Sequence, residues 1–167
     1  MVRRLAELPQ GVKVFIDTNI FHLYLRGPRL VRESCTAFLE RVESGEIEGY
    51  TSTLVLDELA YKLLLKRIEE QYRQNPLKII RERRNVIAEA VPYVEEGLNI
   101  VLGIEKLRVI GIERTHLEEF TEYMSDYLLL PRDALHVALM KTIDCENIAS
   151  ADKDFDVVPG IIRWSPL

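Results

Sequence analysis

The sequence predicts an α/β domain in which helices cover both faces of a short-stranded, mainly parallel sheet. Short runs rich in β-branched and aromatic residues alternate along the chain with longer segments of helical periodicity, a pattern typical of a parallel sheet. The chain has 167 residues, of which 47% are hydrophobic, enough for one core without disulfides or a structural metal. No repeat, low-complexity segment or flexible linker interrupts it, so we expect residues 1–167 to form a single domain.

The first half of the chain contains the clearest strand. Val12 to Ile16 is an apolar run between Gly11 and Asp17, too short for a helix and apolar enough for a strand buried on both faces. Pro76 disfavours helical geometry at the residue before it and closes a long helical segment. The expected elements are a strand over 12–16, helices from about residue 20 and over 30–42, a brief strand over 50–52, and a helix from 53 to 76.

The second half continues the alternation of helices and short strands. Pro131 suits the first position of a helix, where its missing N–H donor is not needed. The expected elements are helices over 77–90 and 92–103, a strand over 109–112, a helix from 115 or 116 to about 130, a helix from 131 to about 141–143, a strand over 147–151, and a short edge strand over 161–163.

The charge balance is unusual for a protein that binds nucleic acid. Lys and Arg number 22 against 27 Asp and Glu, a net charge of −5, which opposes binding through global electrostatics. Divalent cations bound by acidic residues would reverse the local field where a phosphate approaches. Basic residues also cluster along the predicted helices, where they form either a solvated face or a contact surface for RNA or a partner: Lys62, Lys66, Arg67, Arg73, Lys78, Arg81, Arg83 and Arg84.

Cysteine usage and hydropathy predict the compartment. Cys35 and Cys145 lie far apart and form no CxxC motif, so neither a disulfide framework nor a cysteine zinc site is expected. No apolar run reaches the roughly 18 residues that a membrane span needs, and residues 1–10 lack the apolar stretch of a secretory signal. We therefore expect a soluble cytoplasmic protein without a membrane partner.

Two aspartates each follow a predicted strand directly. Asp17 comes after the strand over 12–16, and Asp152 after the strand over 147–151. Carboxyl ends of strands form the edge where open α/β sheets bind ligands. If the strands are neighbours, their spacing of about 4.8 Å brings both carboxylates within reach of one Mg²⁺, at about 2.1 Å for each ligand bond. Each aspartate alone is also explained as a turn former or helix cap.

Two further acids lie near the starts of predicted helices. Glu58 follows the strand over 50–52, and Asp133 sits in the first turn of the helix that Pro131 opens. Acids at this position are stabilised by the helix dipole, and Glu58 also has a possible ion-pair partner in Lys62 one turn later. The helix of Asp133 is otherwise nearly all apolar, which favours a functional role for its one early acid.

Four stretches of the sequence resemble the PIN domain family, and within it the VapC toxins of prokaryotic toxin-antitoxin pairs. They are FIDTNIF, STLVLDELAYKL, PRDALHVALM and IASADKDFDVVPGI. The resemblance implies a three-layer α/β/α fold, a Mg²⁺ or Mn²⁺ site and hydrolysis of RNA phosphodiester bonds. It assigns the catalytic and metal-binding roles to Asp17, Glu58, Asp133 and Asp152, with Glu58 rather than Asp57 as the glutamate of its motif.

The same motifs imply supporting residues and partners. Ser150 and Asn19 would hydrogen-bond a water or the scissile phosphate, although a strand-end hydroxyl and a helix N-cap explain them as well. Asp154 is explained either as a peripheral metal ligand or as an aspartate that forms a turn. His136, one turn after Asp133, is more typical of a structural histidine. The partners implied are RNA, an inhibitory antitoxin protein and a second copy in a homodimer.

The sequence is also compatible with other functions. One is a free-standing PIN nuclease in RNA processing or turnover, and another is a noncatalytic nucleic-acid or protein binding module on the same fold. A phosphatase with an aspartate nucleophile after its first strand needs a second aspartate two residues later, and Asn19 stands there instead. Retention of all four acids favours a nuclease over a binding module.

Overall fold

The computed structural model describes residues 3–166 and contains one six-stranded sheet, so residues 1, 2 and 167 of the expected domain lie outside the described part. Every neighbouring pair of strands is parallel, in the order β1-β6-β5-β2-β3-β4. The prediction of a mainly parallel sheet is confirmed. The strands are β1 (Arg3–Arg4), β2 (Lys13–Ile16), β3 (Glu48–Ser52), β4 (Arg108–Ile110), β5 (Asn147–Ala149) and β6 (Ile162–Ser165).

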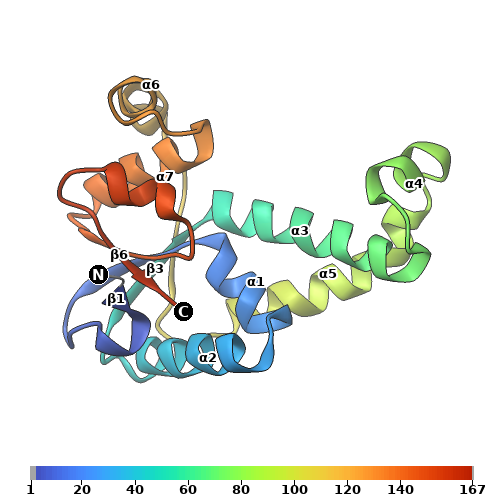
Figure 1. Cartoon of the computed structure of the whole chain (residues 1–167), viewed down its shortest axis with the longest axis horizontal. Helices are drawn as coiled ribbons and strands as arrows, with labels where there is room; N and C mark the ends of the chain where they lie inside the picture. The colour runs from blue at the N-terminus through green and yellow to red at the C-terminus, as the bar shows by residue number, and fades with distance from the viewer. Residues whose placement is uncertain (1–2, 167) are drawn as a thin grey trace.

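Helices lie on both sides of this sheet, which gives the three layers (Figure 1). Right-handed crossovers place the helices after β2 and β3 on one face and, because the chain then reverses direction across the sheet, those after β4 on the other. The helices are α1 (Thr18–Arg26), α2 (Arg29–Ser44), α3 (Thr53–Tyr72), α4 (Pro76–Glu82), α5 (Val86–Leu102), α6 (Arg114–Tyr127) and α7 (Pro131–Thr142), with 3-10 turns η1 (Leu5–Glu7) and η2 (Lys153–Val157).

The helices α3 and α5 pack side by side and extend away from the sheet, with α4 at their far end (Figure 1). Glycine permits their close approach: a methyl group added at Gly97 of α5 would lie 2.6 Å from Cδ1 of Leu63 in α3. The base of this helical hairpin adjoins α1, which contacts α3. Among residues 3–166, no helix combines the length and the apolar character needed to cross a membrane.

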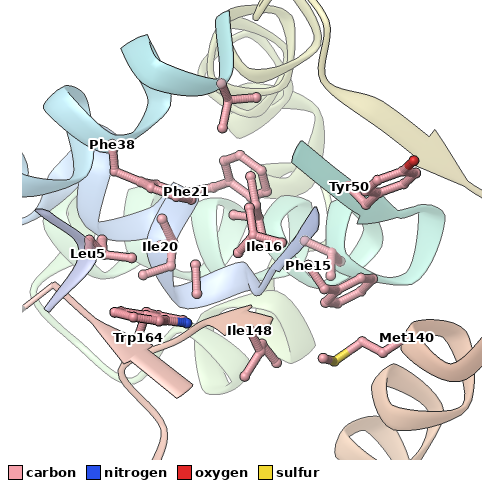
Figure 2. Close-up of a cluster of buried hydrophobic side chains, with 14 of the residues drawn as sticks. Leu5, Phe15, Ile16, Ile20, Phe21, Phe38, Tyr50, Met140, Ile148 and Trp164 are labelled. Atoms are coloured by element: carbon pink, nitrogen blue, oxygen red, sulfur yellow. The ribbon is translucent and has the colours of Figure 1, made fainter. Parts of the chain in front are cut away.

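The central strand β2 supplies the middle of the core because both of its faces are covered. Successive strand side chains point to opposite faces. The ring of Phe15 faces α7, with its centre 5.3 Å from that of His136, and Figure 2 shows Met140 of the same helix on this side. Ile16 points the other way, next to Phe21 of α1 (Figure 2). This two-sided burial explains the uninterrupted apolar run in the sequence.

The order in which the chain adds strands to the sheet reverses at β2, and the acidic residues lie at this point. The chain runs from β2 outward to β3 and β4, then returns to β5 on the other side of β2. Ile16 is paired in register with Ala149, and the backbone N–H of Asp17 donates to the Ala149 carbonyl at 3.1 Å. Residues directly after β2 and β5 therefore meet at the carboxyl edge, where open parallel sheets bind ligands.

The predicted helix boundary near Pro92 is wrong. The break falls at residues 83–85, and Pro92 lies inside α5. Proline leaves the carbonyl of Ala88 without its helical donor, but Ala88 is exposed, so water can satisfy that oxygen. Packing of α5 along α3 keeps the helix continuous through the proline.

Several strand predictions also need correction, including the one over 50–52, since β3 begins at Glu48. Residues 161–163 were expected at the sheet edge, but β6 is covered by β1, whose Arg3 lies over the Trp164 ring. A strand of two exposed arginines carries no apolar pattern from which to predict it. β4 begins one residue and ends two residues before the expected 109–112. β5 ends at Ala149, since the chain turns at Ser150 to form the site.

Candidate functional site

The carboxylate of Asp17 is buried at the start of α1, with 6% of the residue exposed. It caps the helix by accepting a hydrogen bond from the Thr18 backbone N–H at 2.6 Å. Its other oxygen accepts from the Ser150 hydroxyl at 2.7 Å and from the Asn19 amide. Burial raises the pKa of Asp17, against the opposing effects of nearby His136 and of the hydrogen bonds from Ser150 and Thr18. These donors fix the position of the carboxylate at the sheet edge.

Ser150 and Asn19 join the segments that follow β2 and β5. The Asn19 amide donates to the Ser150 hydroxyl at 2.9 Å, and its carbonyl oxygen accepts from the Ala151 backbone N–H at 2.9 Å. The Ser150 hydroxyl also accepts from the Asp152 backbone N–H at 2.9 Å. Ser150 is completely buried. Both residues thus hold the two aspartate-bearing turns together. Ser150 is more than a strand-end hydroxyl, and Asn19 is not the N-cap of α1, because Asp17 takes that position.

Glu58 reaches the same edge from the second turn of α3, which Ser52 caps by accepting from the Val55 backbone N–H at 3.2 Å. One carboxylate oxygen accepts from the Thr18 hydroxyl at 3.0 Å, and the other lies 3.0 Å from Nζ of Lys62. Burial opposes ionisation of Glu58, but the hydrogen bonds and charge of Lys62, with Thr18 and Arg132, outweigh it and lower its pKa. The expected pairing with Lys62 is confirmed, and it coexists with a place in the site.

Asp133, Asp152 and Asp154 form the tightest group of acids in the described part of the chain. One carboxylate oxygen from each lies within 4.8 Å of the others. Asp152 begins η2 and accepts from the Asp154 backbone N–H at 2.9 Å, which turns both carboxylates toward the start of α7. Burial, together with the negative charges of Asp152, Asp17, Asp154 and Glu58, raises the pKa of Asp133 to about 6. Carboxylates this close repel one another unless a cation lies among them.

A cleft of about 500 Å³ lies at the carboxyl edge of the sheet, and Asp154 is not among the residues that line it. All four predicted acids line it, as does Asn19, while Ser150 lies beneath it, bonded to Asp17. Asp57 is elsewhere, in a groove between α3 and α5, because neighbouring residues of a helix point about 100° apart. The cleft lining is Asp17, Asn19, Glu58, Lys62, Leu130, Pro131, Arg132, Asp133 and Asp152.

Two cations and a histidine belong to the site but were not among the predicted site residues. Lys62 and Arg132 line the cleft, and their nitrogens lie 3.0 and 3.7 Å from the same Glu58 oxygen. His136 is 1% exposed, with Nε2 3.8 Å from Asp17 and no hydrogen-bond partner for Nδ1 among residues 3–166. Burial lowers the pKa of His136, against the charges of Asp17 and Glu58. Only spacing in the sequence could have indicated that these cations belong to the site: Lys62 is one turn from Glu58, and Arg132 precedes Asp133.

Comparison with known proteins gives this arrangement a family. The PIN domain profile matches residues 14–161, nearly the whole chain. The chain belongs to the PIN domain family. The resemblance predicted from the four sequence motifs is therefore confirmed.

Curated relatives of this PIN domain include VapC ribonucleases. Ribonuclease VapC13 of Mycobacterium tuberculosis and a VapC ribonuclease of Mycobacterium bovis are each 35% identical to it over 71 residues. These matches cover 42% of this chain and 53% of each relative, so the chain spans about half the length of the curated relatives it matches.

Solved structures share the fold at low sequence identity. VapBC2 from Rickettsia felis, bound to a promoter DNA fragment, has a TM-score of 0.61 at 17% identity, over 92% of this chain and 98% of that one. VapC20 of Mycobacterium tuberculosis, a toxin that cleaves the sarcin-ricin loop, has a TM-score of 0.55 at 16% identity, over 86% and 92%. FitAcB from Neisseria gonorrhoeae has a TM-score of 0.55 at 16% identity, over 92% and 97%. These likenesses establish the PIN fold.

The donor set in this PIN domain fits a hard divalent cation. Carboxylate oxygens are the ligands that Mg²⁺ prefers, and Mg²⁺ is usually bound by one or two carboxylates while keeping several waters. Burial is the largest cause of the raised pKa of Asp133, and the repulsion from the neighbouring acids that adds to it is what a bound cation relieves. The group that can share one ion is Asp133, Asp152 and Asp154, whereas Asp17 and Glu58 are engaged by neighbouring donors.

Proposed function

We propose that this PIN domain is an endoribonuclease that hydrolyses RNA phosphodiester bonds in the cytoplasm with Mg²⁺ or Mn²⁺, and that it is the toxin of a VapBC-type pair. The observation that carries the proposal is the gathering of carboxylates from four separate segments in one cleft. Its similarity to VapC ribonucleases supports RNA as the substrate.

The acids of the cleft divide into two sets by their contacts. Asp133, Asp152 and Asp154 would hold the ion, which when bound supplies Lewis-acid stabilisation of charge during phosphodiester hydrolysis. Asp17 stands beside them as a carboxylate fixed by Ser150 and Asn19, positioned to act on the same ion or to orient a water. No histidine or cysteine nucleophile is required.

Removal of the metal or of Asp17 tests this function. Purified protein is incubated with single-stranded RNA in Mg²⁺ or Mn²⁺, with EDTA, and as the Asp17→Asn variant, and cleavage is followed on denaturing gels. We expect activity with either ion and a loss of at least 100-fold in both of the other arms, since each removes part of the charge arrangement. The matched control is Asp144→Asn, an exposed aspartate outside the cleft. Activity that persists in EDTA would refute the mechanism.

The partners follow from the same proposal. Toxin-antitoxin complexes among the structures that share the fold, such as VapBC2 from Rickettsia felis, support an antitoxin partner. Co-expression with the product of an adjacent short reading frame should restore growth to cells that express this chain, and failure with every neighbouring frame would leave the free-standing nuclease as the better description.

We also propose that the chain forms a homodimer, as its family resemblance implies. Light scattering coupled to size-exclusion chromatography at micromolar concentration should give twice the 19.4 kDa chain mass. A monomer mass would contradict this.

A further inference from the structure

Basic residues lead out of the acidic cleft across α1 and α3. Lys62 and Arg132 stand in the cleft itself, where both contact Glu58. One turn beyond Lys62 on the same face of α3 is Lys66, followed by Arg67. We call Lys62, Lys66, Arg67, Arg26 and Arg132 the basic strip.

The imidazole of His22 on α1 shows that part of this strip is contiguous. Burial lowers the pKa of His22, and the positive charges of Lys62, Lys66 and Arg26 lower it further. Three cations on two packed helices therefore lie near enough to act on one half-buried ring. His22 and Arg26 are themselves one turn apart on α1, so the two helices present their cations to the same region.

The far end of the strip is organised by Tyr93 of α5. The guanidinium of Arg26 lies 4.2 Å from the centre of the Tyr93 ring, and that of Arg67 lies 5.5 Å from it. Stacking against an aromatic ring orders a guanidinium without using its N–H donors. Within residues 3–166, neither Arg26 nor Arg67 has a carboxylate ion-pair partner or a side-chain hydrogen bond.

Arg26 and Arg67 differ in this respect from the arginines of the protein that are neutralised by ion pairs. Arg29, Arg41, Arg114 and Arg163 each pair with a glutamate or aspartate at 2.6 to 2.8 Å. Lys66 is held only loosely by Glu69 and Glu70, at 3.5 and 3.7 Å. A chain with a net charge of −5 thus keeps two exposed guanidiniums that have no ion pair, on the two helices that also carry Asn19 and Glu58 of the cleft.

We propose that the basic strip binds the sugar-phosphate backbone of single-stranded RNA and leads it into the acidic cleft. This deepens the proposed function and rests on it for the identity of the polymer. A phosphate backbone fits both the basic strip and the acidic cleft. On the helices, guanidinium and ammonium groups bind phosphates directly, and at the carboxylates divalent ions bind them. An acidic peptide would match the arginines, but it offers no phosphodiester bond for the cleft to hydrolyse.

The test separates binding along the strip from chemistry in the cleft. Arg26→Gln, Lys66→Gln and Arg67→Gln are combined in one variant, because Lys62 and Arg132 contact Glu58 and would disturb the site itself. The matched control is Arg81→Gln with Lys78→Gln and Arg84→Gln, which removes the same charge in and just after α4, at the far end of the hairpin (Figure 1). Thermal unfolding of both variants verifies that they are folded.

Binding is measured by fluorescence anisotropy of a 5′-labelled 12-nucleotide single-stranded RNA in Ca²⁺, with gels showing that the RNA stays intact. We expect the strip variant to bind at least 10-fold more weakly, and the slope of log K against log salt to become shallower by about 2, or about 0.7 for each lost phosphate contact. The α4 control should stay within 2-fold of the parent. In Mg²⁺, KM for RNA should rise in the strip variant while kcat stays constant.

Each result bears on one of the two proposals. If RNA affinity falls equally in the strip and α4 variants, or falls in neither, the proposal that the basic strip binds RNA is wrong, even if the parent protein cleaves RNA. RNA bound through the strip but never cleaved would overturn the proposed nuclease and leave the strip standing. A strip variant that keeps RNA affinity but escapes antitoxin inhibition would show that the occupant is a protein segment, and would also overturn this inference.

Discussion

At the scale of single residues, the site depends on small polar groups as much as on acids. Ser150 is completely buried, and its one hydroxyl serves Asp17, Asn19 and the backbone of Asp152. Buried donors and acceptors cost more when they lose a partner than the bond contributes when made. The serine therefore supports both the fold and the position of Asp17.

Ser150→Ala should destabilise the protein by about 1 to 3 kcal/mol, because it leaves the Asn19 amide and the Asp152 N–H without their buried acceptor. Urea unfolding followed by circular dichroism measures the change. Ser125→Ala on α6 is the control, since its exposed hydroxyl bonds only to carbonyls of its own helix. A Ser150 variant as stable as the control would mean that water replaces the hydroxyl without cost.

Residue types and spacing were enough to predict which acids lie in one cleft, but not which other side chains each acid contacts. Strand-end positions place Asp17 and Asp152 at one edge, and the structure brings Glu58 and Asp133 to the same cleft. The sequence predicts that Lys62 pairs with Glu58 but not that Arg132 does, because a partner more than 70 residues away depends on tertiary packing. Asp154 joins the closest acid group only through the turn at η2, which spacing leaves undecided.

At the scale of elements, packing between helices decides what local sequence preference leaves open. Proline predicts a helix boundary, and at Pro92 that prediction is wrong because α5 gains more from lying along α3 than it loses at one backbone hydrogen bond. At Gly97, α5 has no room for a side chain against Leu63 of α3, and no periodicity of apolar residues predicts this contact. Helix boundaries that depend on such contacts between helices cannot be predicted from the sequence alone.

Gly97→Ala should destabilise the hairpin by about 1 to 3 kcal/mol, because the new methyl group would lie 2.6 Å from the side chain of Leu63. Thermal or urea unfolding measures this. Gly111→Ala is the matched control, since nothing lies within 4 Å of the corresponding position. If Leu63 moves aside freely, the Gly97 variant will instead be more stable through its better helix propensity, and the close packing assigned to this contact would be wrong.

At the scale of the whole molecule, distant segments become neighbours through the order of strands. The alternation of strands and helices predicts a parallel sheet covered on both faces, and the structure confirms it. Strand order depends on crossover direction and on which strand lies at the edge, so the cover that β1 gives to β6 could not be predicted from two arginines. The site lies where that order reverses, between β2 and β5.

Mn²⁺ should raise the thermal stability of the protein, because the acids that can hold it come together only in the folded state. At 100 times the dissociation constant, the gain is about 2.7 kcal/mol. Differential scanning calorimetry with and without the ion measures it, with Asp144→Asn responding like the parent and Asp152→Asn losing most of the gain. An equal response in both variants would place the ion outside the cleft.

The position of β5 beside β2 also has a consequence for synthesis. Asp17 and Glu58 leave the ribosome long before Asp133, Asp152 and Asp154 exist, and β2 has no neighbour on one side until β5 emerges. A nascent chain therefore holds an incomplete set of acids until residues 133–154 have been made. Under the proposed function, such a chain has no means of attacking the message that encodes it before that point.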